Sequence, residues 1–152
     1  MVIFRCDGTY EGILTAVFSG YRSDDVMIEC DNDNMFVFGE CTEVVTDLSK
    51  SLRVAKGIRK ISYEAEYMMY LAALNNNPDR GTDIFYFVKS VFQNGAGGIS
   101  DYHDVHVANV NKMCRNTGRE YDHFRGFLRF EQYDNFLLGK IHPVNNLLTL
   151  LG

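Results

Sequence analysis

The chain has 152 residues, of which 46% are hydrophobic, and it carries a formal net charge of −5. A chain of this length buries roughly 70% of the surface that it exposes when unfolded, so we expect one compact domain over residues 1–152. The hydrophobic content and the presence of only 2 prolines exclude a disordered chain. The negative charge excludes a protein that coats nucleic acid with an overall basic surface, so any contact with DNA has to be local.

The cysteine pattern and the N-terminus predict a cytoplasmic protein. No two of the cysteines form a CxxC pair; they are Cys6, Cys30, Cys41 and Cys114. Reduced thiols are therefore expected. The N-terminal segment reaches Arg5 and Asp7 before an apolar run has become long enough for a signal peptide or a membrane span. We predict no membrane contact.

The first third of the chain predicts strands on either side of one helix. Residues 2–6 are typical of a strand, and Asp7 and Gly8 form the turn that starts a helix, with Asp7 as its cap. Apolar residues then recur on one helical face; they are Tyr10, Ile13, Leu14, Val17, Phe18 and Tyr21. Short runs of strand-forming residues follow at 26–30, 35–38 and 43–45. The first of these runs fits either a strand or a helix.

The middle of the chain predicts capped helices. Asp47 caps a helix that reaches about residue 61, and Ser62 caps the next one. The second helix directs these residues inward: Tyr67, Tyr70, Leu71 and Leu74. A further helix over residues 79–93 ends in the glycine-rich segment 95–98. Its core-facing residues are Ile84, Val88 and Val91.

The last third of the chain predicts one long helix and then a hairpin. Apolar positions recur by three and four from Val107 to Phe124, which indicates the helix. Residues 126–132 and 136–141 form the two strands of the hairpin. Short strands at both ends of a helical middle favour a single α+β domain. We expect the hairpin to join the N-terminal strand in one antiparallel sheet.

The sharpest charge asymmetry lies in residues 50–60, which hold 5 of the 15 basic residues and no acid. Its candidate nucleic-acid-binding residues are Lys50, Arg53, Lys56 and Lys60. Arg53, Lys56 and Lys60 share one helical face, on which they can meet successive phosphates. The alternative is a solvated face opposite Leu52 and Ala55.

A second basic stripe follows the predicted long helix and continues into the strand after it. Its candidate nucleic-acid-binding residues are Arg115, Arg119, His123 and Arg129. Arg129 lies in the apolar run 126–130, and a guanidinium buried there requires a negative partner. Either these residues form one wall of an anion-binding groove, or acids such as Glu120 and Glu131 pair the arginines internally.

No enzyme motif is recognisable in the chain. It has no Gly-x-Ser-x-Gly motif, no phosphate loop and no Cys/His pair of defined spacing. His103 and His106 lie three residues apart beside acids, but surface histidines at a helix start are commoner than metal ligands. We predict neither a metal site nor a cofactor.

Short motifs over nearly the whole chain carry a family resemblance. They are Asp7-Gly8, the helical segment from Tyr10 to Phe18, Val44-Val45-Thr46-Asp47, Asp104-Val105 with Lys112-Met113, Glu120, Gly126-Phe127-Leu128-Arg129-Phe130, Ile141-His142-Pro143 and Asn146-Leu147-Leu148. Together they resemble a bacterial family called probable DNA metabolism proteins. The resemblance implies association with a putative DNA-repair radical-SAM protein, and a related domain occurs fused to a uracil-DNA-glycosylase-like domain. It implies no catalytic residues.

The chain departs from this family in two places. Asp122 and His123 stand where the family commonly has a His-Arg pair, which makes this turn less positive. The family usually continues beyond the apolar segment 147–151, so we expect a truncated or reduced member.

We therefore expect an accessory protein of bacterial DNA metabolism or repair, whose basic helices contact DNA or a DNA-bound partner. The resemblance implies that this partner is the radical-SAM protein. One alternative is an enzyme acting on a nucleotide or a damaged base, which requires a desolvated Asp7, Asp47 or His123 beside the arginines. Another is a protein-interaction subunit of the radical-SAM partner, which an exposed apolar patch without a basic groove favours.

Overall fold

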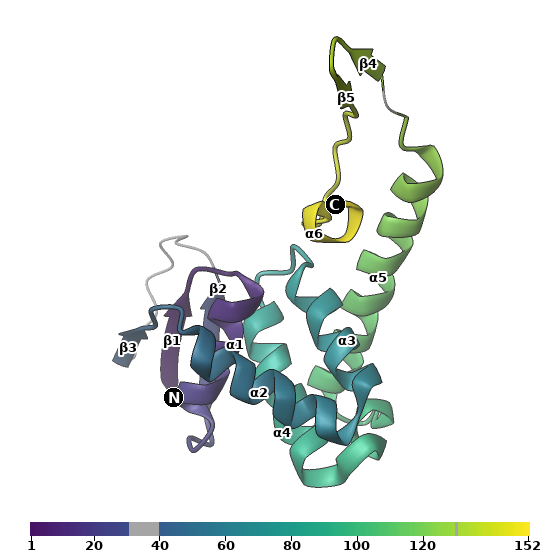
Figure 1. Ribbon diagram of the computed structural model, residues 1–152. Coiled ribbons are helices and arrows are strands. Elements are labelled where there is room, and N and C mark those ends of the chain that lie inside the picture. Colours follow the sequence, from purple (N-terminus) through teal and green to yellow (C-terminus); the bar gives the residue numbers. More distant parts are fainter. Residues whose placement is uncertain (31–39, 130) are drawn as a thin grey trace.

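A computed structural model describes residues 1–30, 40–129 and 131–152 and has an α+β fold with a helical middle (Figure 1). Short strands near the N-terminus form one sheet, and a hairpin near the C-terminus forms another. The predicted fold class is confirmed. Within the described residues, no helix combines the length and the apolar character needed to cross a membrane.

The N-terminal sheet is parallel. Strand β1 (Val2–Cys6) lies between β2 (Val26–Cys30) and β3 (Glu40–Glu43) and pairs with both in parallel. Helix α1 (Tyr10–Gly20) connects β1 to β2, as a parallel pair requires, because such strands need a crossover connection. The strand at 26–30 is confirmed. The strand expected at 43–45 ends at residue 43 instead, and the run 35–38 lies outside the described residues.

The predicted caps of the middle helices are confirmed. Helix α2 (Leu48–Ile61) starts after Asp47, whose carboxylate accepts hydrogen bonds from the backbone N–H groups of residues 49 and 50. Helix α3 (Tyr63–Ala73) starts after Ser62, whose hydroxyl accepts from the N–H of residue 65. Each side chain satisfies donors that a helix start leaves without a partner. Local chemistry therefore fixes where these helices begin.

Helix α4 (Arg80–Asn94) is the centre of the core. Its residues Ile84, Phe85, Phe87, Val88 and Val91 are fully buried, and it packs against β2, α2, α3 and α5 (Val105–Phe127). The 3-10 helix η1 (Gly95–Ser100) ends α4 at the predicted glycine-rich segment.

The prediction that Tyr67 of α3 points into the core is wrong. Tyr67 is half exposed, because the buried face of α3 is carried by Ala65, Met69 and Ala72, which are spaced by four and three residues and so share one side of the helix. Tyr67 falls outside that stripe, whereas Leu71 is buried as predicted.

The C-terminal hairpin does not join the N-terminal sheet, so that prediction is wrong. Strands β4 (Glu131–Tyr133) and β5 (Phe136–Leu138) pair only with each other among the described residues. Helix α5 has 23 residues, at about 1.5 Å per residue, and carries the chain away from the parallel sheet (Figure 1). It also takes up residues 126 and 127, so the first hairpin strand starts later than predicted. The chain ends near helix α6 (Leu148–Leu151).

Candidate functional site

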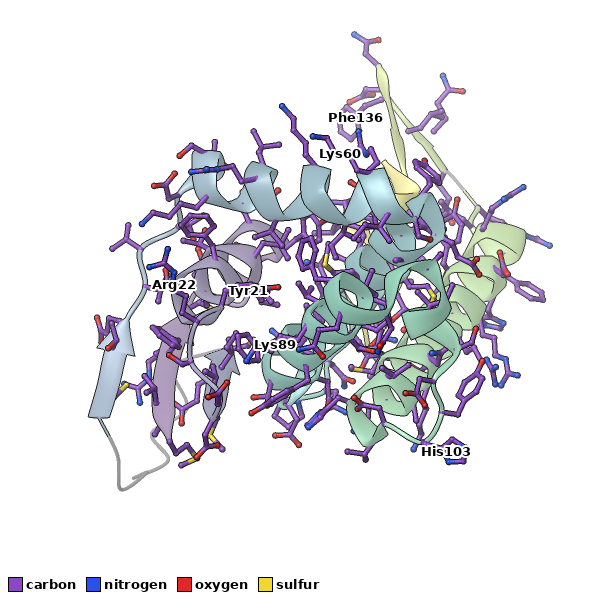
Figure 2. The ribbon with its side chains drawn as sticks, turned by 90° about the horizontal axis from the view of Figure 1, so that it is seen from below. Tyr21, Arg22, Lys60, Lys89, His103 and Phe136 are labelled. Carbon is purple, nitrogen blue, oxygen red and sulfur yellow. The ribbon has the colours of Figure 1, made fainter. Side chains whose placement is uncertain are left out.

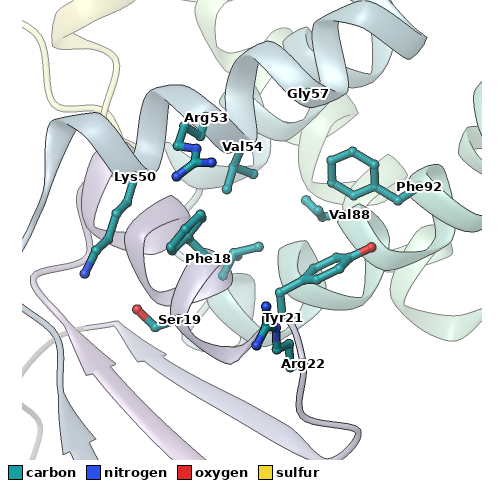
Figure 3. A pocket seen from close by; sticks show the side chains of 11 residues that line it. Phe18, Ser19, Tyr21, Arg22, Lys50, Arg53, Val54, Gly57, Val88 and Phe92 are labelled. Carbon is teal, nitrogen blue, oxygen red and sulfur yellow. The ribbon is translucent and has the colours of Figure 1, made fainter.

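A cleft of about 790 Å³ lies between α1, α2 and α4 (Figure 3). The end of α1 and the turn after it contribute Val17, Phe18, Ser19, Tyr21 and Arg22. Helix α2 contributes Lys50, Arg53, Val54 and Gly57, and α4 contributes Val88 and Phe92. We call this the α1–α2–α4 cleft. Pairwise packing of the three helices brings these residues together, although they are far apart in the sequence.

Aromatic rings line the cleft and remain accessible. Phe18, Tyr21 and Phe92 are 37%, 40% and 36% exposed. The rings of Tyr21 and Phe92 meet edge to face with centroids 5.7 Å apart. Edge-to-face pairs hold both rings in place, so the cleft offers preformed aromatic surfaces.

The small size of Gly57 lets Phe92 approach α2. A Cβ atom at residue 57 would come within 3.0 Å of the Phe92 ring, so a larger side chain would push that ring aside. The glycine therefore helps to set the width of the cleft.

The charge of the cleft is positive. Its charged lining residues are Arg22, Lys50 and Arg53, with no acid among the lining residues. Arg53 lies over the Phe18 ring, 5.5 Å from its centroid, where the ring face attracts the cation. Lys50 reaches Asp47 only at 3.9 Å, a partly exposed contact of little energy. In the described part of the chain, neither the Arg22 nor the Arg53 guanidinium has a carboxylate within 4.0 Å.

The predicted basic residues of α2 divide into two groups. Lys50 and Arg53 line the cleft, whereas Lys56 and Lys60 are exposed on α2 outside it. Lys60 is labelled in Figure 2. Arg59, from the same acid-free segment, forms a bidentate ion pair with Glu66 of α3, with N–O distances of 2.6 and 2.7 Å. An acid from α3 therefore pairs with a cation of segment 50–60, although that segment itself contains no acid.

The predicted residues of the second stripe lie elsewhere. Arg115, Arg119 and His123 are exposed on α5, and Arg129 is exposed in the segment after α5. Helices α3 and α4 each pack against both α2 and α5, so they separate the two basic helices. The two stripes therefore do not form the walls of one groove.

The expected environment of Arg129 is wrong. This residue lies between α5 and β4 rather than inside a strand, and it is exposed, so its guanidinium is solvated and needs no obligatory partner. Glu120, expected as a partner of the arginines, instead accepts hydrogen bonds from the backbone N–H groups of Val144 and Asn145. It ties the segment before α6 to α5.

The acids and the histidine required by the enzyme alternative lie outside the cleft. Asp47 caps α2, His123 is exposed on α5, and Asp7 lies in a smaller polar pocket of about 370 Å³ at the carboxyl end of β1. None of the three is desolvated beside the cleft cations.

Asp7 has a different structural role from the predicted one. The cap of α1 is Thr9, whose hydroxyl accepts from the N–H of Gly12. The Asp7 carboxylate instead accepts from the backbone N–H and hydroxyl of Thr9 and from the hydroxyl of Thr46. Burial raises the pKa of Asp7, but these hydrogen bonds outweigh it and bring the pKa below its usual value. Gly8 has the positive φ of 71° expected of the turn.

His103 and His106 lie in different surroundings in the structure. His106 Nδ1 lies 2.7 Å from the buried Asp83 of α4, and its ring stacks on Tyr86, whereas His103 lies in the turn before α5. No group of three or more His, Cys, Asp or Glu residues able to hold a metal occurs in the described ranges.

Sequence reasoning missed part of the cleft. The helical spacing places Phe18 and Tyr21 on the apolar face of the first helix without indicating a cleft, and it does not single out Arg22 or Phe92. The available signal was the position of Phe18, Tyr21 and Arg22 at the end of α1, where the helix leaves the core.

Comparison with known proteins relates the second half of the chain to one family model. Residues 78–152 match a model described as a domain of unknown function (DUF4130). The matched segment contains α4 and α5 but not α1 or α2, so it covers only one side of the cleft. Neither a search of the curated proteins nor a search of the solved structures found a match.

Proposed function

We propose that this protein binds single-stranded nucleic acid in the α1–α2–α4 cleft as an accessory protein of DNA metabolism or repair. The observation that carries this proposal is the meeting of three cations with three accessible aromatic rings around one acid-free cleft. Proteins that bind single strands combine these two features, because cations follow the phosphates while bases stack on the rings.

The arrangement favours a single strand over a duplex. In a duplex the base faces are stacked on one another, so no base face would be available to stack on the Phe18, Tyr21 or Phe92 ring. In a single strand each stacked base contributes about 1–3 kcal/mol. The net charge of −5 opposes broad contact with a polyanion, which restricts binding to this local positive surface.

The DNA-metabolism part of the proposal rests on the family resemblance of the sequence motifs. That resemblance also supports a radical-SAM DNA-repair protein as a partner. The free cysteines support the cytoplasm as the location. The enzyme alternative has less support, because Asp7, Asp47 and His123 lie outside the cleft lining.

A second candidate function is that of a protein-interaction subunit. Its support is the hairpin, where Phe136, Leu137 and Leu138 are between 54% and 65% exposed, with Phe136 visible on the projecting hairpin in Figure 2. Apolar side chains exposed side by side are typical of protein contact surfaces. Here, however, a basic cleft is present as well.

A salt-dependent titration tests the nucleic-acid proposal. A fluorescent single-stranded oligonucleotide and its duplex are titrated with the protein at several salt concentrations. We expect tighter binding of the single strand and a log-affinity against log-salt slope of about −0.7 for each phosphate that the protein neutralises. The matched variants are Arg53→Gln in the cleft and Arg115→Gln on α5, which remove the same charge from different helices.

Only the cleft variant should weaken binding and flatten the slope. Equal binding of single strand and duplex, or equal effects of the two variants, would contradict the proposal.

A further inference from the structure

Two cysteines face each other at the carboxyl edge of the parallel sheet. Cys6 ends β1 and Cys30 ends β2, and the two residues are direct partners in the parallel register. Directly paired residues of neighbouring strands project their side chains to the same face of a sheet. Both thiols are buried, at 5% and 6% exposure. Register therefore brings the two sulfur atoms together.

The surroundings hold the sulfur atoms close to each other. The Cys6 thiol donates a hydrogen bond to the backbone carbonyl of Glu29, the residue before Cys30 in β2, at 3.6 Å. On the other side, a Cβ atom at Gly81 would lie only 2.7 Å from the Cys30 sulfur. The start of α4 thus closes over Cys30, and only a glycine leaves room for it.

The surroundings of Cys6 favour its thiolate. Hydrogen bonding by Cys30 is the largest influence on the pKa of Cys6. Together with the N–H of Gly8 and the charge of Arg80 it outweighs burial and the charge of Asp7, so the pKa of Cys6 falls below its usual value. The pKa of Cys114 shifts in the opposite direction, because burial is the largest influence there and raises it. Cys114 is therefore a natural internal control.

We propose that Cys6 and Cys30 are a peroxide-reactive dithiol that forms a disulfide between β1 and β2. Neighbouring strands lie about 4.7–4.9 Å apart, which falls within the Cα separation of about 4.4–6.8 Å that disulfides span. The cross-link would tie β2 to the end of β1, the strand that leads into the turn with Asp7 and Gly8. This site is independent of the proposed nucleic-acid cleft.

The reaction needs hydrogen peroxide as its oxidant. The Cys6 thiolate attacks one peroxide oxygen and breaks the O–O bond, which gives a sulfenic acid and a hydroxide that takes up a proton to become water. The Cys30 sulfur then attacks the Cys6 sulfur, the S–O bond breaks, and a second water leaves with the Cys30 proton. Two thiols lose two electrons in total, and one peroxide is reduced to two waters.

Peptide mapping tests the proposal. Trypsin places Cys6 in peptide 6–22 and Cys30 in peptide 23–50, which also contains Cys41. The experiment therefore uses both the unaltered protein and Cys41→Ser, a change at an exposed residue. Each protein is treated with hydrogen peroxide, its remaining thiols are alkylated, and its peptides are analysed without reduction.

We expect peptides 6–22 and 23–50 to become joined in both proteins, with the mass of two hydrogen atoms lost. Alkylation of Cys6 and Cys30 should fall together, whereas Cys114 in peptide 113–115 stays alkylated. In Cys6→Ser, Cys30 should remain alkylated after the same treatment. Persistent alkylation of both cysteines, oxidation of Cys6 without joining, or joining to peptide 113–115 would overturn the proposal.

Discussion

The two basic helices, α2 and α5, carry cations at similar spacing but in different surroundings. Arg53 of α2 lies over an aromatic ring and lines a cleft, whereas Arg115 and Arg119 of α5 are exposed on their helix. Helix spacing can place cations on one face, but only the packing of neighbouring elements supplies the rings. Only the cations of α2 therefore lie in a cleft of the kind in which we propose that nucleic acid binds.

The largest expected effect comes from reversing the charge of the cleft. The triple variant Arg22→Glu, Lys50→Glu and Arg53→Glu should lose about 3 kcal/mol or more of binding free energy, since one charge-assisted hydrogen bond contributes about 1.5–3 kcal/mol. Titration with a single-stranded oligonucleotide measures this loss. The matched control reverses Lys56 and Lys60, which lie on α2 outside the cleft lining, and should lose less. A larger loss in the control would indicate that the nucleic acid contacts the outer face of α2 instead of the cleft.

Removing a ring should have the next largest effect. Phe92→Leu keeps an apolar side chain in the cleft but removes the stacking surface, so the binding free energy should fall by about 1–3 kcal/mol. The salt slope should stay unchanged, because the slope reports neutralised phosphates. Phe136→Leu on the hairpin is the control and should bind as the unaltered protein does. An altered slope in Phe92→Leu would mean that the ring acts by positioning the cations.

A change at Asp7 should affect stability but not binding. Asp7→Ala should cost about 1 kcal/mol in the free energy of unfolding, because it removes the hydrogen bonds that Thr9 and Thr46 donate to the carboxylate. Because the pKa of Asp7 is lowered in the folded protein, its contribution is present above the unfolded-state pKa and is lost as pH falls through the folded-state pKa. Denaturant titrations at neutral and acidic pH measure this difference. A normal stability combined with weakened binding would place Asp7 in the functional site.

The smallest expected effect is at α5. Arg119→Gln should change affinity for single strands less than Arg53→Gln does at 0.15 M salt, where charges separated by more than about 8 Å are largely screened. Parallel titrations of the two variants measure the ratio. An equal or larger loss for Arg119→Gln would restore α5 as the binding surface and break the comparison on which the proposal rests.

The sequence was most informative where a few neighbouring residues decide the structure. Asp47 and Ser62 start their helices by bonding to N–H groups two or three residues later, so short-range chemistry was sufficient to predict them. The turn at Gly8 followed in the same way. The apolar spacing of α4 also placed Val88 and Val91 in the core correctly.

Features that depend on packing between distant segments could not be predicted. The direction of the N-terminal sheet depends on the crossover through α1, and the position of the hairpin depends on how far α5 extends. The ion pair between Arg59 and Glu66 removed one cation from an apparently acid-free segment. The cleft itself needs Phe18 of α1 and Phe92 of α4 to line the same hollow, although they are 74 positions apart in the sequence.

Photo-crosslinking with a single-stranded oligonucleotide that contains 5-iodouracil tests the central claim most directly, because the excited base joins to the aromatic ring on which it stacks. The account predicts crosslinks in tryptic peptides 6–22 and 90–112, with fragment masses that locate them at Phe18, Tyr21 or Phe92. Crosslinks confined to α5 peptide 120–125 or to the hairpin, with none at the three cleft rings, would contradict it.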